Sequence, residues 1–166
     1  MYFEKCQDLN ELKSVYKKLA LQHHPDCGGD LRIMQEINAE YDRIFLLLKA
    51  KQNFAANDDV TGRTKRTTET PSEFREIVSI LLKLDGIEEV ELCGSWVWIS
   101  GHGTFQHKEA LKAAGCRWSR SKKKWYWHHV EDDCYWSRGT ATMQEIRQKY
   151  GSEWLREKEE RATLPA

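Results

Sequence analysis

Residues 12–26 read LKSVYKKLALQHHPD, and this stretch decides the first part of the fold. Its apolar residues fall at the spacing of one helix face: Leu12, Val15 and Leu19. Asp8 can cap such a helix, and the acidic residue three positions later completes a capping-box pattern. Pro25 ends the helix, because the residue before a proline avoids helical geometry. We therefore predict a helix over residues 9–23.

A second amphipathic helix follows after a short turn. Residues 27–30 read CGGD, and the two glycines can adopt the positive φ angles that turns require. The apolar residues after the turn again recur at intervals of three and four: Met34, Ile37, Tyr41, Ile44 and Leu48. We predict a helix from about Leu31 to Gln52 that packs antiparallel on the first helix through the two apolar stripes.

The order of these features resembles the J-domain family. The first helix ends in His24-Pro25-Asp26, a glycine turn follows, and the second helix contains QEINAEYDRIF at residues 35–45. His-Pro-Asp alone is also an ordinary helix-ending turn, so the resemblance depends on the two matching helices around it. It covers residues 1 to about 52. It implies an all-α hairpin that binds a DnaK-type chaperone of the heat-shock seventy family and stimulates its ATPase.

The resemblance assigns chaperone binding to the loop and to the first helix. The residues concerned are His24, Pro25, Asp26, Lys13, Tyr16, Lys17 and Lys18. The three lysines lie off the apolar stripe, so we expect them to face an acidic partner surface and to speed association in a salt-dependent way. A solvated helix face would carry the same lysines, and only the adjacent tripeptide favours a binding role. Tyr16 borders both faces and could pack inward or touch the partner.

Some positions depart from the family pattern. Gln22 and Cys27 stand where basic residues are common, and Glu40 replaces a usual alanine. The first two remove positive charge beside the loop, which predicts weaker binding or a preference for one particular chaperone. Residues 2–6 occupy the place of the family's short first helix.

The remaining sequence predicts a second domain of different construction. Residues 55–71 are polar and lack an apolar period, so we interpret them as a flexible linker between a J-domain at 1–54 and a small α+β domain at 72–166. The elements expected in that domain are a helix capped by Ser72 and ending near Leu84, a strand at 90–100, a short helix stopped by Gly115, a β-hairpin at 116–129 and a helix at 142–161.

The expected hairpin is rich in tryptophan and in basic residues. Trp118 would pair with Trp125 and Cys116 with Trp127, so that these four side chains share one face. Residues that suit single-stranded nucleic acid are Arg117, Arg120, Lys122, Lys123, Lys124 and Tyr126. A hairpin with a buried tryptophan face and an exposed basic turn has the same composition. Exposed tryptophans would equally suit a protein-binding module that recruits a client.

Other activities find less support in the sequence. LKAAGCRWSRSKKKWYW at residues 111–127 is faintly similar to small modules of phages and other mobile elements, and that likeness carries no activity over. A metal site would draw on Cys116, His128, His129 and Cys134, but zinc usually has a close ligand pair such as CxxC. We expect no metal, no cofactor and no enzyme activity, since no nucleophile, base and orienting group can be recognised together.

Composition also narrows the expected partners and cell compartment. The 166 residues include 26 basic and 26 acidic side chains, so bulk charge does not favour a polyanion, and only a local patch would. Five cysteines without a CxxC pair, with no secretory signal and no apolar run of membrane length, predict a cytoplasmic protein with free thiols and no membrane partner. We expect a two-domain co-chaperone whose second domain targets a client or site. The alternative is a nucleic-acid-associated factor of a phage or mobile element that recruits or sequesters the host chaperone.

Overall fold

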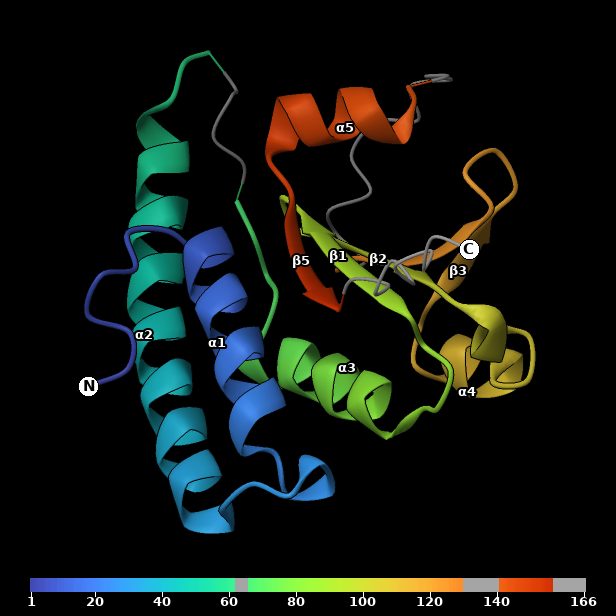
Figure 1. Cartoon of the computed structure of the whole chain (residues 1–166). Coiled ribbons are helices and arrows are strands. Elements are labelled where there is room, and N and C mark those ends of the chain that lie inside the picture. Colours follow the sequence, from blue (N-terminus) through green and yellow to red (C-terminus); the bar gives the residue numbers. More distant parts are fainter. Residues whose placement is uncertain (62–65, 130–140, 157–166) are drawn as a thin grey trace, which may run out of the picture. The chain divides into compact units, whose positions relative to one another are not determined.

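The computed structural model describes residues 1–61, 66–129 and 141–156. The chain divides into two compact units, one formed by Met1–Asp85 with His128–Thr140 and the other by Gly86–Trp127 with Ala141–Ala166. The described part of the first unit contains helices, and that of the second combines helices with an antiparallel sheet (Figure 1). The predicted succession of an all-α region and an α+β region is therefore confirmed. None of the helices in the described ranges has the length and apolar character needed to span a bilayer.

Helix α1 (Leu9–His23) begins and ends where the sequence predicts. The Asp8 side chain caps it by accepting a hydrogen bond at 2.9 Å from the amide of the third helical residue. A short 3-10 turn, η1 (Pro25–Cys27), follows. Helix α2 (Leu31–Asp58) then runs past the predicted end at Gln52.

Helices α1 and α2 lie side by side and antiparallel (Figure 1). The ring centroids of Tyr16 and Tyr41 are 4.3 Å apart, and the Tyr16 hydroxyl donates a hydrogen bond to Asn38 Oδ1 at 2.9 Å. The buried apolar residues of the pair are Leu9, Leu12, Tyr16, Ala20, Met34, Ile37, Tyr41 and Phe45. The predicted stripes are therefore confirmed in part. Four of their residues are buried, namely Leu12, Met34, Ile37 and Tyr41, and four are only partly buried, namely Val15, Leu19, Ile44 and Leu48.

The N-terminal segment forms a turn instead of the short helix expected at residues 2–6. Phe3 is buried, and its ring centroid lies 6.1 Å from that of Tyr41. The Glu40 carboxylate accepts hydrogen bonds from the amides of Tyr2 and Phe3, at 3.0 and 3.3 Å. Glu40 thus anchors the N-terminal segment to α2.

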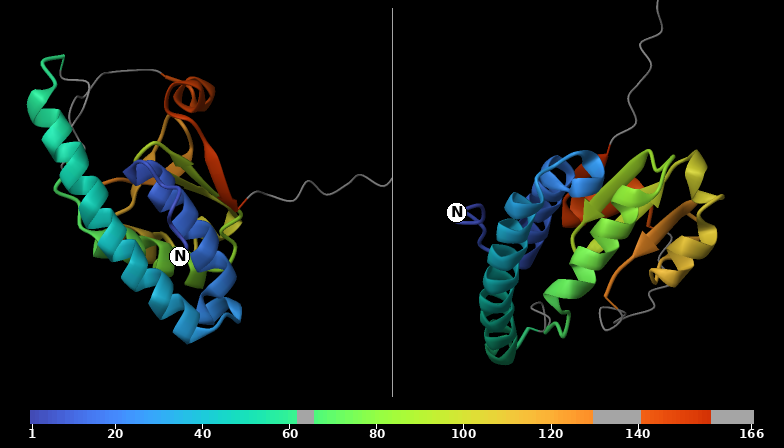
Figure 2. Two further views of the ribbon diagram at one scale, coloured as in Figure 1. Left: turned by 90° about the vertical axis from the view of Figure 1, so that its left-hand side faces the viewer. Right: turned by 90° about the horizontal axis from the view of Figure 1, so that it is seen from below.

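Helix α3 (Pro71–Lys83) belongs to the first compact unit, whereas the sequence-based division starts the second domain at residue 72. The helix packs against both α1 and α2 (Figure 2). Its buried residues are Phe74, Ile77, Val78 and Leu81. The Phe74 ring centroid lies 6.3 Å from that of Tyr16 and 6.4 Å from that of Tyr41. The apolar stripe seen in the sequence therefore completes the helical core.

The described residues just before α3, which the sequence analysis places in a linker at 55–71, form hydrogen bonds with α2. Asn53 exchanges two hydrogen bonds with the backbone of Thr67, at 3.0 and 2.8 Å. Lys49 Nζ donates to the carbonyl oxygen of Glu69 at 2.9 Å, and the side chains of Thr67 and Glu69 are buried. Polar side chains of α2 thus satisfy the backbone of this segment, and polar composition alone does not reveal such pairing.

The five described strands of the second unit form an antiparallel sheet in the order β3-β4-β2-β1-β5. They are β1 (Glu89–Cys93), β2 (Trp96–Ser100), β3 (Arg117–Ser119), β4 (Lys124–Trp127) and β5 (Glu153–Arg156). The single strand predicted at 90–100 is thus two strands joined at Gly94 and Ser95. Gly94 has a φ of 59°, as two-residue hairpin turns require at their first central position.

Short helices connect these strands: η2 (His102–Thr104), α4 (Lys108–Ala113) and α5 (Met143–Tyr150). Gly115, with a φ of 84°, follows α4 as predicted. The helix predicted at 142–161 is wrong for residues 151–156, and residues 157–161 lie outside the described ranges. Gly151 takes a φ of 75° there, and the chain turns into β5, which pairs with β1.

Candidate functional site

The loop at residues 24–26, the HPD loop, is fixed by hydrogen bonds of its own backbone. The amides of Cys27 and Gly29 both donate to the His24 carbonyl oxygen, at 2.9 and 3.0 Å. Gly29 also packs against the end of α1, where a Cβ would lie 2.1 Å from the His23 carbonyl carbon. A glycine is therefore needed at this position for the chain to turn back so closely.

The HPD loop presents two of its residues outward and holds its histidine inward. Pro25 and Asp26 are exposed, whereas the His24 side chain is 13% exposed. His24 Nδ1 accepts a hydrogen bond from the Asp26 amide at 3.2 Å, so a neutral imidazole carries its proton on Nε2, 3.4 Å from Ser79 Oγ. The Asp26 carboxylate lies 3.8 Å from Lys83 Nζ. Two side chains of α3 thus reach the loop.

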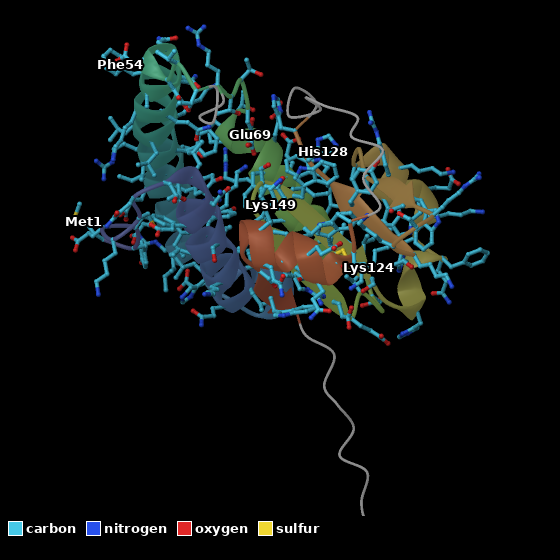
Figure 3. All side chains as sticks on the ribbon, turned by 90° about the horizontal axis from the view of Figure 1, so that it is seen from above. Met1, Phe54, Glu69, Lys124, His128 and Lys149 are labelled. Atoms are coloured by element: carbon cyan, nitrogen blue, oxygen red, sulfur yellow. The ribbon has the colours of Figure 1, made fainter. Side chains whose placement is uncertain are left out.

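Two of the three lysines expected on the surface are buried, so that prediction is wrong for Lys13 and Lys17. Their side chains are 2% and 1% exposed. Lys13 forms an ion pair with Glu69, which Figure 3 labels in the segment before α3. The Nζ atoms of Lys13 and Lys17 lie 5.2 and 5.5 Å from the centre of the Phe74 ring. Lys18 is exposed as predicted.

Tyr16 packs inward, which decides between its two predicted orientations. Its side chain is buried between the helices, and its hydroxyl is bonded to Asn38. Burial raises the pKa of Tyr16 to about 12, so the phenol stays protonated. Tyr16 is therefore a core residue that positions α1 against α2.

Sequence reasoning missed the residues by which α3 and its leading segment reach this site. They are Glu69, Phe74, Ser79 and Lys83. The sequence did indicate that α3 packs on other helices, because the apolar stripe that begins at Phe74 must be buried against another apolar surface. A hairpin of two helices also buries too little surface to be stable alone, which points to a third helix in the same unit.

The hairpin of β3 and β4 has the predicted pairing. Trp118 faces Trp125 across the strands, with ring centroids 5.7 Å apart. Trp118 remains exposed because β3 lies at the edge of the sheet, whereas Trp125 is buried. Arg117 stands opposite Tyr126, so the expected alternation of faces is confirmed.

The basic residues of this hairpin fall into two groups. Lys124 pairs with Glu89 at 2.8 Å, and Lys122 Nζ lies 5.8 Å from the centre of the Trp98 ring. These two lysines thus already contact a carboxylate and an aromatic ring on the face of the sheet. The exposed members of the predicted set are Arg117, Arg120 and Lys123.

An aromatic layer covers part of the same face. The centroids of Trp96 and Trp98 are 5.8 Å apart, and Tyr126 lies 5.2 Å from the first and 5.5 Å from the second. Trp98 is buried. Because the rings stack on one another, they occupy ring faces that a nucleic-acid base would otherwise use.

A buried carboxylate links α5 to β1. Glu91 is 0% exposed and accepts hydrogen bonds from Arg147 Nε at 2.5 Å, from Arg147 Nη2 at 2.8 Å and from Ser152 Oγ at 2.6 Å. Burial opposes ionisation, but these hydrogen bonds outweigh it and hold the pKa of Glu91 below its ordinary value. The Arg147 guanidinium also lies 5.1 Å from the centre of the Trp154 ring.

The described residues that the sequence analysis considered as metal ligands do not lie in surroundings that suit a metal ion. Burial raises the pKa of Cys116 to about 12, which disfavours the thiolate that zinc binds. The two ring nitrogens of His129 lie 2.8 Å from Glu73 Oε2 and 2.8 Å from Thr68 Oγ1. Cys134 lies outside the described residues. Within the described ranges, no three His, Cys, Asp or Glu side chains are grouped so as to hold a metal ion.

Comparison with known proteins adds one partial likeness. No family model matches the chain, and no solved structure matches it. The chain is 40% identical over 52 residues to the ER-phagy receptor 1 of Schizosaccharomyces pombe. The match covers 31% of this chain and 12% of the receptor, so less than a third of the chain is similar to a small part of that protein.

Proposed function

We propose that this chain is a J-domain co-chaperone that binds a DnaK-type chaperone of the heat-shock seventy family and stimulates its ATPase. The observation that carries the proposal is the HPD loop, held at the apex of two packed antiparallel helices with Pro25 and Asp26 exposed. A loop whose backbone is fixed by hydrogen bonds loses less conformational entropy when it binds a partner. The second unit would select the client or the place of action.

In this proposal the ATP chemistry takes place in the partner. Asp26 contacts a cationic group of the chaperone, while His24 and Pro25 hold the loop around it. Binding favours the chaperone conformation that hydrolyses ATP, so the effect is a shift of a conformational equilibrium. Lys18, exposed on α1, adds an attraction that weakens as salt is raised.

Single-turnover ATP hydrolysis by a DnaK-type chaperone tests the proposal. The wild type should raise the rate, and His24→Gln and Asp26→Asn should each remove most of that increase. Asp58→Asn is the matched control, because Asp58 is exposed at the opposite end of α2 and its change removes the same charge. Full stimulation by the Asp26→Asn variant would refute the assigned role of the loop.

A second candidate function is the binding of single-stranded nucleic acid by the hairpin, in a factor of a phage or mobile element that recruits or sequesters the chaperone. Trp118 favours it, because an exposed ring in the same hairpin as exposed Arg120 and Lys123 offers stacking together with charge. A gel shift at two salt concentrations tests it. Binding should be lost in Trp118→Ala and kept in Lys112→Ala, a change of an exposed lysine on α4. Absence of a shift at low salt would remove this candidate.

A further inference from the structure

Helix α2 carries an apolar stripe on the side away from its buried residues. The exposed residues Leu47, Ala50 and Phe54 recur at intervals of three and four, so they lie on one face. Leu47 is 60% exposed and Phe54, labelled in Figure 3, is 71% exposed. Single exposed leucines are common on soluble proteins, but a continuous apolar stripe is typical of an interaction surface.

The stripe is long because α2 continues beyond the end that the sequence predicts. The helix ends at Asp58, and Phe54 lies in the added part. The neighbouring Asn53 holds this part in place by exchanging hydrogen bonds with the backbone of Thr67, at 3.0 and 2.8 Å. Phe54 is thus presented to solvent on a fixed helix, which loses little conformational entropy when it binds a partner.

Opposite charges stand at the two ends of the stripe. Arg43 lies one helical turn before Leu47, and Asp58 lies one turn after Phe54, and both charged residues are exposed. When two copies of α2 lie antiparallel with Leu47 opposite Phe54, the same register brings Arg43 opposite Asp58. A parallel pair would instead place like charges against each other, which opposes association. The charges therefore favour an antiparallel pairing of this face with itself.

We propose that this face of α2, the α2 stripe, binds a second copy of the chain and forms a two-fold symmetric antiparallel dimer. The residues of the α2 stripe are Arg43, Leu47, Ala50, Phe54 and Asp58. In such a contact every residue occurs twice, so two contacts of Leu47 with Phe54 form the apolar centre. Two ion pairs of Arg43 with Asp58 form the rim. Ala50 lies near the midpoint, where its small side chain lets the helix axes approach.

The α2 stripe is small, so the dimer is weak. It covers about four helical turns of each copy, and contacts below about 1,200 Å² in total are typical of transient complexes. We expect a Kd of about 10–100 μM. The exposed ion pairs at the rim add little affinity and weaken as salt is raised.

The dimer leaves both HPD loops accessible, so the inference is independent of the proposed function. In the antiparallel register the partner helix ends opposite Arg43, and residues 31–42 of α2 extend beyond it. At a rise of about 1.5 Å per residue, the end of α2 next to the HPD loop lies about 20 Å from the partner helix. Changes in the α2 stripe, Asp58→Asn included, should therefore leave ATPase stimulation unchanged.

Sedimentation equilibrium of the full chain tests the dimer. The weight-average mass of the wild type should rise from 19.5 kDa towards twice that value as the concentration is raised from about 2 to about 300 μM. Phe54→Lys should raise Kd at least about thirtyfold, because it places a charge in both halves of the apolar centre. Phe105→Lys is the matched control, because Phe105 is 77% exposed in the second unit and undergoes the same change; its Kd should equal that of the wild type.

Charge reversal tests the register. Arg43→Glu and Asp58→Lys should each raise Kd about fivefold at low salt, because each creates two like-charge contacts at the rim. The double variant should return to within about twofold of the wild type, since both ion pairs form again with their signs exchanged. Far-ultraviolet circular dichroism should be the same for all variants, because every changed side chain is exposed.

Four results would overturn the dimer. They are a wild type that stays monomeric at every concentration, a Kd unchanged by Phe54→Lys, a Kd raised equally by Phe105→Lys, and a double charge variant as weak as the single ones. A monomeric chain that pellets with phosphatidylcholine vesicles, and loses this property in Phe54→Lys, would assign the α2 stripe to a lipid surface instead.

Discussion

Arg147→Met should destabilise the second unit and reverse the way its stability depends on pH. In the wild type, hydrogen bonds from Arg147 and Ser152 outweigh burial and hold the pKa of Glu91 below its ordinary value. The ionised carboxylate therefore stabilises the fold above the ordinary carboxyl pKa of about 4.3, and this contribution is lost as pH falls through the lower folded value. In the variant, burial dominates and raises the pKa, so the variant gains stability as pH falls.

The expected magnitude follows from the burial of the carboxylate. Glu91 is 0% exposed, and removing the partner of a buried charge costs about 3–5 kcal/mol. Because the Arg147 side chain is 35% exposed, solvent weakens the pair, and we expect a loss of about 2–3 kcal/mol at pH 7. At pH 4 the buried carboxyl of the variant is protonated, and the loss should shrink to about 1 kcal/mol, mostly from the contact with Trp154.

Urea unfolding at pH 7, 5.5 and 4, followed by tryptophan fluorescence, measures these losses. Six of the seven tryptophans lie in the second unit, so the signal reports its unfolding. Lys149→Met is the control, because Lys149 is exposed on the same helix (Figure 3) and should cost less than about 0.5 kcal/mol. An equal loss at all three pH values would refute the argument that Glu91 is ionised and held by Arg147.

Three further predictions concern single positions. Gly29→Ala should lower the free energy of unfolding by about 1–3 kcal/mol, because the alanine Cβ would lie 2.1 Å from the His23 carbonyl carbon. Urea unfolding followed by circular dichroism measures this loss, and an unchanged free energy of unfolding would show that the loop can shift. Thr142→Ala should lower the free energy of unfolding by about 1 kcal/mol, because it removes the capping box of α5. Unfolding followed by tryptophan fluorescence measures this change, and an unchanged free energy would mean that α5 is held by its packing alone. Cys116 should resist iodoacetamide at pH 8, because burial raises its pKa to about 12, while exposed Cys27 reacts; equal rates for the two thiols would contradict the burial.

The first hairpin could be predicted because its determinants are local. Asp8 caps α1 from the adjacent position, and Pro25 ends the helix by its own geometry. The pairing of Trp118 with Trp125 is equally local, since a four-residue turn and the alternation of side chains fix the register. Such features need no knowledge of the rest of the chain.

The burial of Lys13 and Lys17 depends on residues far along the sequence. Glu69 lies 56 positions after Lys13, and no pattern within α1 distinguishes a lysine that will pair with it from a solvated one. The two errors in the second unit have another origin. Gly94 and Gly151 both take positive φ angles and end an element, but the dense apolar residues around the first and the helical period before the second obscured these signals.

The assignment of His129 to the first unit has a consequence for how the protein can be divided. The backbone passes between the units after Asp85, returns after Trp127 and leaves again before residue 141. His129 then contacts Thr68 and Glu73, at the entrance to α3. The helical unit is thus complete only when a later part of the polypeptide has come back to it. A fragment ending at residue 85 would lack that imidazole, so the two units cannot be exchanged as cassettes joined at a single junction.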